Sequence, residues 1–99
     1  MPADLPQPLA TLSGDAQEGY ALSGVLRAPA VTGLLVELPV ERGLQQLDLA
    51  SLEAVDSAGL ALLLEWQRRL QEVGGQLVVK NAPSALARLA RIGGVDTLL

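Results

Sequence analysis

The order of three patterns in the middle of the chain limits its possible folds more than any other feature. The run "LQQLDLA" predicts a strand at about 44–49, and the nearly continuous apolar run "QLVVK" predicts a strand at 76–80 that is buried on both faces. Between them, a helix is predicted to begin near Ser57 and to stop at Gly74-Gly75. A strand, a helix and a second strand in this order are typical of a parallel strand pair joined by a right-handed crossover.

The helix that begins near Ser57 is predicted to have two different faces. Its buried stripe follows the i, i+3, i+4, i+7 rule and consists of Leu60, Leu63, Leu64, Gln67 and Leu70. The opposite face is charged toward its carboxyl end and almost uncharged near Ser57; it consists of Ala58, Ala61, Leu62, Glu65, Arg68, Arg69 and Glu72. Trp66 fits either a position beside the core or an anchor in an interface.

Two short strands are predicted before this unit. They span about Pro8–Leu12 and Tyr20–Leu26, and a turn at Gly14-Asp15 joins them into a hairpin. Residues 1–8 contain three prolines and are expected to be a loose lead-in.

Two further helices complete the pattern. Apolar residues at 31–38 fit one helical face, but Gly33 lies within this segment and Pro39 ends it, so a short, weak helix is expected. A third helix is predicted to begin at Pro83 and to end at Gly93-Gly94. Its inward-facing residues are Leu86, Leu89 and Ala90, and Arg88 and Arg91 face out. The last segment, 95–99, is expected to form a strand or a first helical turn. The sequence therefore predicts one α/β domain over 1–99: a small, mostly parallel or mixed sheet with helices packed against it.

Composition excludes several classes of function. The chain has no cysteine and no histidine, so thiolate chemistry, His-based catalysis and the usual zinc sites are absent, and we expect no catalytic residue, cofactor or metal. A formal charge of −4 does not suit a nucleic-acid-binding surface. The sequence contains neither a Gly-rich phosphate loop nor a basic cluster, so a ligand-binding domain has little support.

The amino terminus and the apolar runs indicate where the protein resides. The first eight residues lack the basic and apolar segments of a secretory signal, and the longest apolar stretch, 58–64, is shorter than the roughly 20 residues that span a bilayer. We therefore expect a cytoplasmic protein without direct membrane insertion. With Gly counted and Tyr left out, about 58% of the residues are apolar, above the usual 45–50%. Either an Ala/Leu-biased proteome or an apolar surface reserved for another protein explains this surplus.

The segment Asp56-Ser57-Ala58-Gly59 stands at the beginning of the central helix. An Asp or Ser at this point caps the unpaired backbone N–H groups of the first turn. Gly59 costs roughly 1 kcal/mol relative to alanine in a helix, so it indicates that another backbone or side chain approaches closely. A phosphate on Ser57 would be tolerated by the helix dipole, although Asp56 beside it would oppose the added charge.

The second half of the sequence resembles a STAS domain, the fold of sulfate transporters and anti-sigma factor antagonists. The strand ending in "LDLASLEAV", then "DSAGLALLL", the two-glycine break and "LVVKNAPSALARLARIGGVDTLL" carry the resemblance. It is strong over 44–99 and weak before Gly24. In anti-sigma factor antagonists of this family, the Ser or Thr after the Asp is phosphorylated, and Ser57 occupies that position.

Within the family, "VDSAGLALLLEW" and "NAPSALARLARIGGVDTLL" are most similar to the small STAS subunits (MlaB-like) of bacterial lipid-asymmetry (Mla) ABC transporters. This resemblance implies a non-catalytic cytoplasmic subunit, associated with the inner membrane through its complex. Such a subunit binds the transporter's ATPase subunit (MlaF-like), reaches the membrane permease indirectly, and supports phospholipid traffic and outer-membrane lipid asymmetry. The residues expected to take part in partner binding are Asp56, Ser57, Ala58, Gly59, Ala61, Leu62 and Glu65.

One segment departs from the family pattern. STAS domains commonly read Gly-Glu-Leu-Asp at the end of the early strand, whereas this chain has Gly24-Val25-Leu26-Arg27. The loss of both acids removes polar contacts near the beginning of the central helix. The alternative function, an anti-sigma factor antagonist switched by phosphorylation of Ser57, is therefore less favoured than the transporter subunit.

Overall fold

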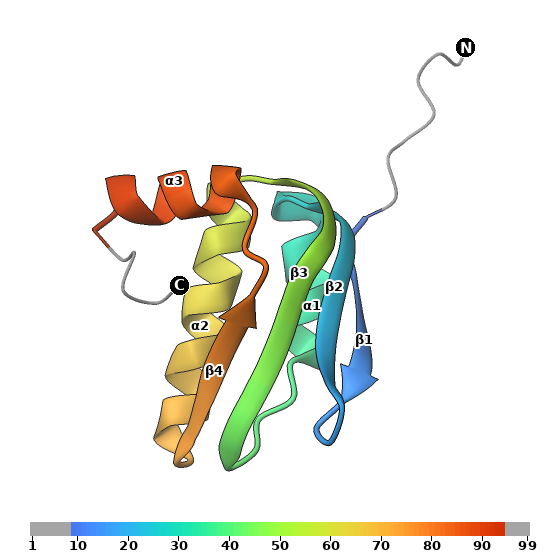
Figure 1. Ribbon diagram of the computed structural model, residues 1–99, viewed down its shortest axis with the longest axis vertical. Coiled ribbons are helices and arrows are strands. Elements are labelled where there is room, and N and C mark those ends of the chain that lie inside the picture. Colours follow the sequence, from blue (N-terminus) through green and yellow to red (C-terminus); the bar gives the residue numbers. More distant parts are fainter. Residues whose placement is uncertain (1–8, 95–99) are drawn as a thin grey trace.

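A four-stranded mixed sheet forms one layer of the molecule, and helices cover one of its faces (Figure 1). The computed structural model describes residues 9–94. Its elements in chain order are β1 (Thr11–Asp15), β2 (Gly19–Leu26), α1 (Ala28–Glu37), β3 (Gly43–Val55), α2 (Ser57–Glu72), β4 (Gly75–Lys80) and α3 (Ser84–Ile92). The predicted lead-in at 1–8 and the last segment at 95–99 lie outside the described residues.

The sheet order β1-β2-β3-β4 follows the chain. β1 pairs with β2 in antiparallel fashion, while β2 with β3 and β3 with β4 are parallel. Each parallel pair needs a crossover, and α1 and α2 supply the two crossovers on the same face of the sheet (Figure 1). The predicted α/β class and the mixed, largely parallel sheet are confirmed.

The opening hairpin is present, but its predicted turn was wrong. β1 begins at Thr11 rather than near Pro8, and Gly14 and Asp15 pair with β2 instead of forming the turn. The chain reverses after Asp15, whose Oδ1 accepts hydrogen bonds from the backbone N–H groups of Gln17 at 2.9 Å and Glu18 at 2.7 Å. Asp15 therefore ends the strand and organises the turn with its side chain.

β3 is longer and β4 more exposed than the sequence predicted. β3 extends to Val55 because β2 continues to pair with it as far as Leu26. β4 was expected to be buried on both faces, but only one face of the sheet carries helices and β4 pairs on one side, with β3. Leu77 is therefore buried while Gln76 is exposed.

The helix predicted at 31–38 is a full element, α1, with Pro29 in its first turn. Gly33 is accepted within it because it lies in open space, with no atom within 4 Å of an added Cβ. α3 agrees with the prediction, since Leu86 and Ala90 are buried and both Arg88 and Arg91 are exposed.

The core lies between the sheet and its helices. Trp66 is fully buried there, so it belongs to the core. The Tyr20 ring meets it edge-on, with ring centroids 5.9 Å apart. The largest other fully buried side chains are Leu22, Leu26, Leu34, Leu47, Leu49, Leu62, Leu63, Leu70 and Leu86.

Candidate functional site

The first turn of α2 is capped by Asp56, whose Oδ1 accepts a hydrogen bond from the Gly59 N–H at 3.1 Å. Ser57 is the first residue of the helix and is exposed. Because the cap is supplied by Asp56, the Ser57 hydroxyl is not needed to hold the helix start. It is therefore available to a partner or to a modifying enzyme.

Gly59 permits a close approach, as its sequence position suggested, and the approaching group is the protein's own sheet. A Cβ at this position would lie 2.7 Å from Val55 Cγ2 and 2.9 Å from the carbonyl oxygen of Leu26. The same carbonyl accepts a hydrogen bond from the Asp56 N–H at 3.2 Å. Gly59 is itself buried, so it fixes where α2 begins on the end of β2 and thereby positions Ser57.

The placement of Leu62 on the outer face of α2 was wrong. Leu62 is 1% exposed and belongs to the core. The reason is α1, which packs against this side of α2. Arg69, two helical turns after Leu62, donates a hydrogen bond from Nη1 to the Leu35 carbonyl oxygen of α1 at 2.9 Å. Leu62 faces the same side as Arg69, and α1 covers it.

Three small residues remain at the surface near the beginning of α2. Ser57 and Ala61 are exposed and Ala58 is half-buried. None carries a charge, and together we call them the small-residue face. Their short side chains allow another protein to approach the helix closely, and such a surface can pack without burying an unpaired charge.

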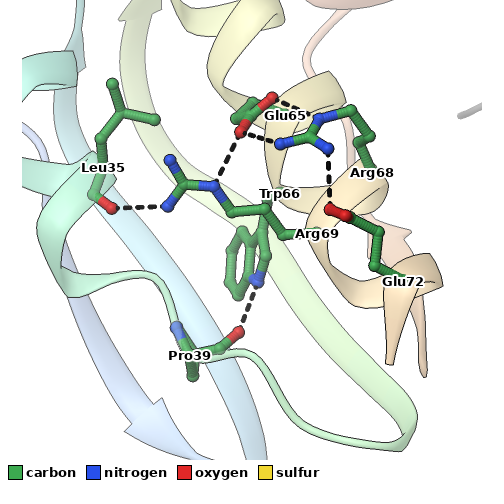
Figure 2. A network of polar contacts seen from close by, with 7 residues as sticks. All are labelled: Leu35, Pro39, Glu65, Trp66, Arg68, Arg69 and Glu72. Carbon is green, nitrogen blue, oxygen red and sulfur yellow. Dashed lines mark hydrogen bonds and ion pairs between the residues drawn. The ribbon is translucent and has the colours of Figure 1, made fainter. Parts of the chain in front are cut away.

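Glu65 borders the small-residue face and already has internal partners (Figure 2). Its Oε1 accepts from Arg68 Nε at 2.9 Å, and its Oε2 accepts from Arg68 Nη2 and Arg69 Nε, both at 2.7 Å. Arg68 also donates to Glu72 Oε1 at 2.7 Å. The hydrogen bonds from Arg68, and then those from Arg69, lower the pKa of Glu65 to about 2.

Two residues of α2, three positions apart, also hold the end of α1 and the loop that follows it, as Figure 2 shows. Arg69 reaches the Leu35 carbonyl, and Trp66 donates from Nε1 to the Pro39 carbonyl at 2.9 Å. The carbonyls at the end of a helix need such donors. The sequence left Trp66 open between the core and an interface and placed Arg69 on the outer face; it did not show that Arg69 bonds to α1 and Trp66 to the loop after it.

Arg27 lies close to this site, although the sequence marked it only as a departure from a family pattern. It precedes α1 and follows Leu26, the residue that contacts Gly59 and Asp56. Its side chain is exposed. The ends of β2 and β3 therefore bring together Arg27 and Asp56, which are far apart in the sequence.

The candidate site is an exposed surface. Within residues 9–94, no three acidic side chains are grouped so that they could hold a metal ion, and no pocket opens on this part of the chain. Among the helices of the described part, none is long and apolar enough to cross a membrane.

Comparisons with known proteins identify a family and solved structures of similar fold. The family model described as "Mlab, STAS domain" matches residues 13–99. The solved structure of the anti-sigma factor antagonist SpoIIAA in its unphosphorylated form is similar, with a TM-score of 0.68 and 18% sequence identity. The match covers 90% of this chain and 84% of that chain, and at this identity it establishes a shared fold. No curated protein sequence matches the chain.

Proposed function

This chain belongs to the STAS domain family of the MlaB type, and from that membership we propose that it is a non-catalytic accessory subunit of an ABC phospholipid transporter. In this role it binds the transporter's cytoplasmic ATPase subunit, which is MlaF-like, and meets the permease only indirectly. It acts at the inner membrane as part of the complex and helps to maintain the lipid asymmetry of the outer membrane.

The small-residue face supports this proposal. Ser57, Ala58 and Ala61 contact the ATPase subunit, and Glu65 lies at the border of the contact. Asp56, Gly59 and Leu62 support that surface from beneath: Asp56 caps the helix, Gly59 seats it on β2, and Leu62 fills the space under α1. Interfaces whose centre lacks charge and packs closely are typical of stable complexes.

A second function remains a candidate because of the state of Ser57. Its hydroxyl is exposed at a helix N-terminus and does not serve as the cap. A phosphate there would add about −1.5 to −2 charges where the helix dipole accepts them. In this alternative the chain is an anti-sigma factor antagonist whose binding is switched by phosphorylation of Ser57.

Affinity purification of the tagged protein from its native membranes, followed by mass spectrometry of its partners and of Ser57, tests the two functions. The transporter function predicts an ABC ATPase and its permease in the eluate, with Ser57 unmodified. Recovery of a serine kinase, or of phosphorylated Ser57 in a pool free of the transporter, would instead support the switch.

Replacement of Ser57 provides a second test. Ser57→Ala is expected to weaken binding of the ATPase subunit by about 1 kcal/mol, because one interfacial hydrogen bond is lost. The Asp56 cap remains, so the free energy of unfolding should stay within about 0.5 kcal/mol of wild type. Under the switch, Ser57→Asp would reproduce the phosphorylated state, whereas Ser57→Ala would bind the kinase partner constitutively. Titration calorimetry with each purified partner distinguishes these outcomes.

A further inference from the structure

Exposed arginines lie on both sides of the small-residue face. On one side is Arg27, because the Leu26 carbonyl before it accepts the Asp56 N–H at 3.2 Å. This bond places the backbone of Arg27 next to the residue that precedes Ser57. The Arg27 side chain is exposed, and it forms no ion pair with any residue between 9 and 94.

On the other side is α3, which packs against α2 and lies beside its N-terminal turns (Figure 1). Arg88 and Arg91 are exposed on its outer surface, and Ile92 next to them is 78% exposed. The helix contains no acidic residue. Because these cations come from β2–α1 and from α3, they form no cluster in the sequence.

The acidic side chains have a different distribution. Near the small-residue face stand Asp56, whose carboxylate accepts the Gly59 N–H, the exposed Glu53, and Glu65, which is already paired with Arg68 and Arg69. Asp15 and Glu41 precede β2 and β3, respectively, and therefore lie at the opposite ends of these parallel strands. In a chain of formal charge −4, the exposed Arg27, Arg88 and Arg91 thus come from the two elements beside the small-residue face, whereas the exposed Arg42 lies at the opposite end of β3 and Arg68 is paired with Glu65 and Glu72.

We infer that the partner of this chain presents a protein surface with an apolar centre bordered by carboxylates, which pair with Arg27 on one side and Arg88 on the other. The inference rests on the proposed function and specifies the chemistry of the ATPase surface. Guanidinium groups bind carboxylates in a bidentate geometry and are well suited to interface ion pairs. Opposite charges around a docking surface raise the association rate and select the partner.

A membrane surface fits these residues less well. The apolar side of α3, which includes Leu86 and Ala90, is buried against the core and cannot insert between lipids. Ile92 is the one large apolar side chain that α3 exposes. Stable binding to a bilayer needs a larger apolar surface or a cluster of several basic residues, and Ile92 with two arginines provides neither.

Charge reversal tests the inference with the complete chain and the purified ATPase subunit. Arg27→Glu and Arg88→Glu should each raise the Kd by about 10-fold, mainly through slower association, and should reduce its salt dependence. Arg42→Glu is the matched control, because this exposed arginine lies beside Gly74 at the opposite end of β3. It should leave the Kd within about 2-fold of wild type. Circular dichroism verifies that each variant is folded. Arg27→Glu should not disturb α1, because an acidic residue before a helix interacts favourably with the helix dipole.

The outcomes separate the inference from the proposed function. If wild type binds the ATPase subunit and both reversals behave like Arg42→Glu, the inference is overturned while the function stands. If wild type does not bind the ATPase subunit, the function fails and the inference fails with it. Sedimentation with phosphatidylglycerol vesicles that is lost in both reversals, without a change in ATPase binding, would assign the arginines to lipid and also overturn the inference.

Discussion

At the scale of single residues, Gly59 illustrates how one missing side chain positions a surface. An added Cβ would meet Val55 and Leu26 at distances that real Cβ atoms do not adopt. Ser57, two positions earlier, is therefore placed by a contact in which it takes no part. The sequence indicated a close approach at Gly59, and the structure shows that the approaching residues belong to β2 and β3.

Gly59→Ala is expected to lower the free energy of unfolding by about 1–3 kcal/mol, because the overpacking exceeds the gain in helix propensity. Gly33→Ala is the matched control, since it also lies within a helix but has nothing within 4 Å of the added Cβ. It should raise the free energy of unfolding by about 1 kcal/mol. Urea unfolding followed by circular dichroism measures both; equal effects of the two substitutions would contradict the role of Gly59.

Glu65 makes stability depend on pH at the acid end. Its pKa is lowered from 4.5 to about 2 by Arg68 and Arg69, so the folded state favours the carboxylate. The resulting stabilisation is complete above pH 4.5 and is lost as the pH falls toward 2. Glu65→Gln should therefore show a smaller decrease in its urea midpoint across this range than wild type. Glu37→Gln, which replaces an exposed carboxylate of α1, should follow wild type; identical curves for all three proteins would disprove the linkage.

At the scale of elements, α1 depends on α2. It has no basic residue in its last turn and no side-chain cap at its start, and Gly33 weakens it further. Arg69 and Trp66 of α2 supply hydrogen bonds to the carbonyls of Leu35 and Pro39, at its end and just beyond. α1 in turn covers Leu62, so the two helices form one supporting layer behind the small-residue face.

Arg69→Ala should loosen α1, because it removes the donor to the Leu35 carbonyl. We expect faster hydrogen exchange of the α1 amides, with the sheet amides unchanged. Arg68→Ala is the control: Arg68 also bonds to Glu65, but its hydrogen bonds remain within α2. If both variants accelerated exchange in α1 equally, the link through Leu35 would not be what holds this helix.

The elements that sequence predicted well are those whose pattern is local. The start of α2 and the apolar positions of α3 follow from helical spacing, and both are confirmed. The full length of β3 depends on pairing with β2, and the burial of Leu62 depends on α1; neither contact is visible in a local pattern. The Gly14-Asp15 turn was wrong because the Asp15 side chain directs the reversal after it.

The polar residue in the buried stripe of α2 is also explained by a tertiary contact and not by the local pattern. Gln67 was placed in this stripe by its spacing alone, and it is half-buried. Its Oε1 accepts the Leu77 N–H of β4 at 2.7 Å, which links α2 to that strand. Helical periodicity identified the face, while only the tertiary structure shows why a polar residue is suitable there.

At the scale of the whole molecule, the apolar surplus and the proposed contact surface are separate features. The large exposed apolar side chains among residues 9–94 are Leu9, Val36, Val40, Leu44, Val73 and Ile92. None belongs to the small-residue face. The proposed contact therefore relies on small side chains and close approach at its centre, with arginines at its sides, rather than on a large apolar patch.

The affinity of the ATPase subunit for Ala61→Glu tests whether the small-residue face is the docking surface. Ala61 is exposed within the small-residue face, and a bound partner would bury a carboxylate there without a counter-charge. Gln76→Glu adds the same charge at an exposed position of β4, away from α2. We predict that Ala61→Glu weakens binding by at least about 10-fold while Gln76→Glu binds like wild type. Unchanged affinity of a folded Ala61→Glu variant would show that the partner docks elsewhere.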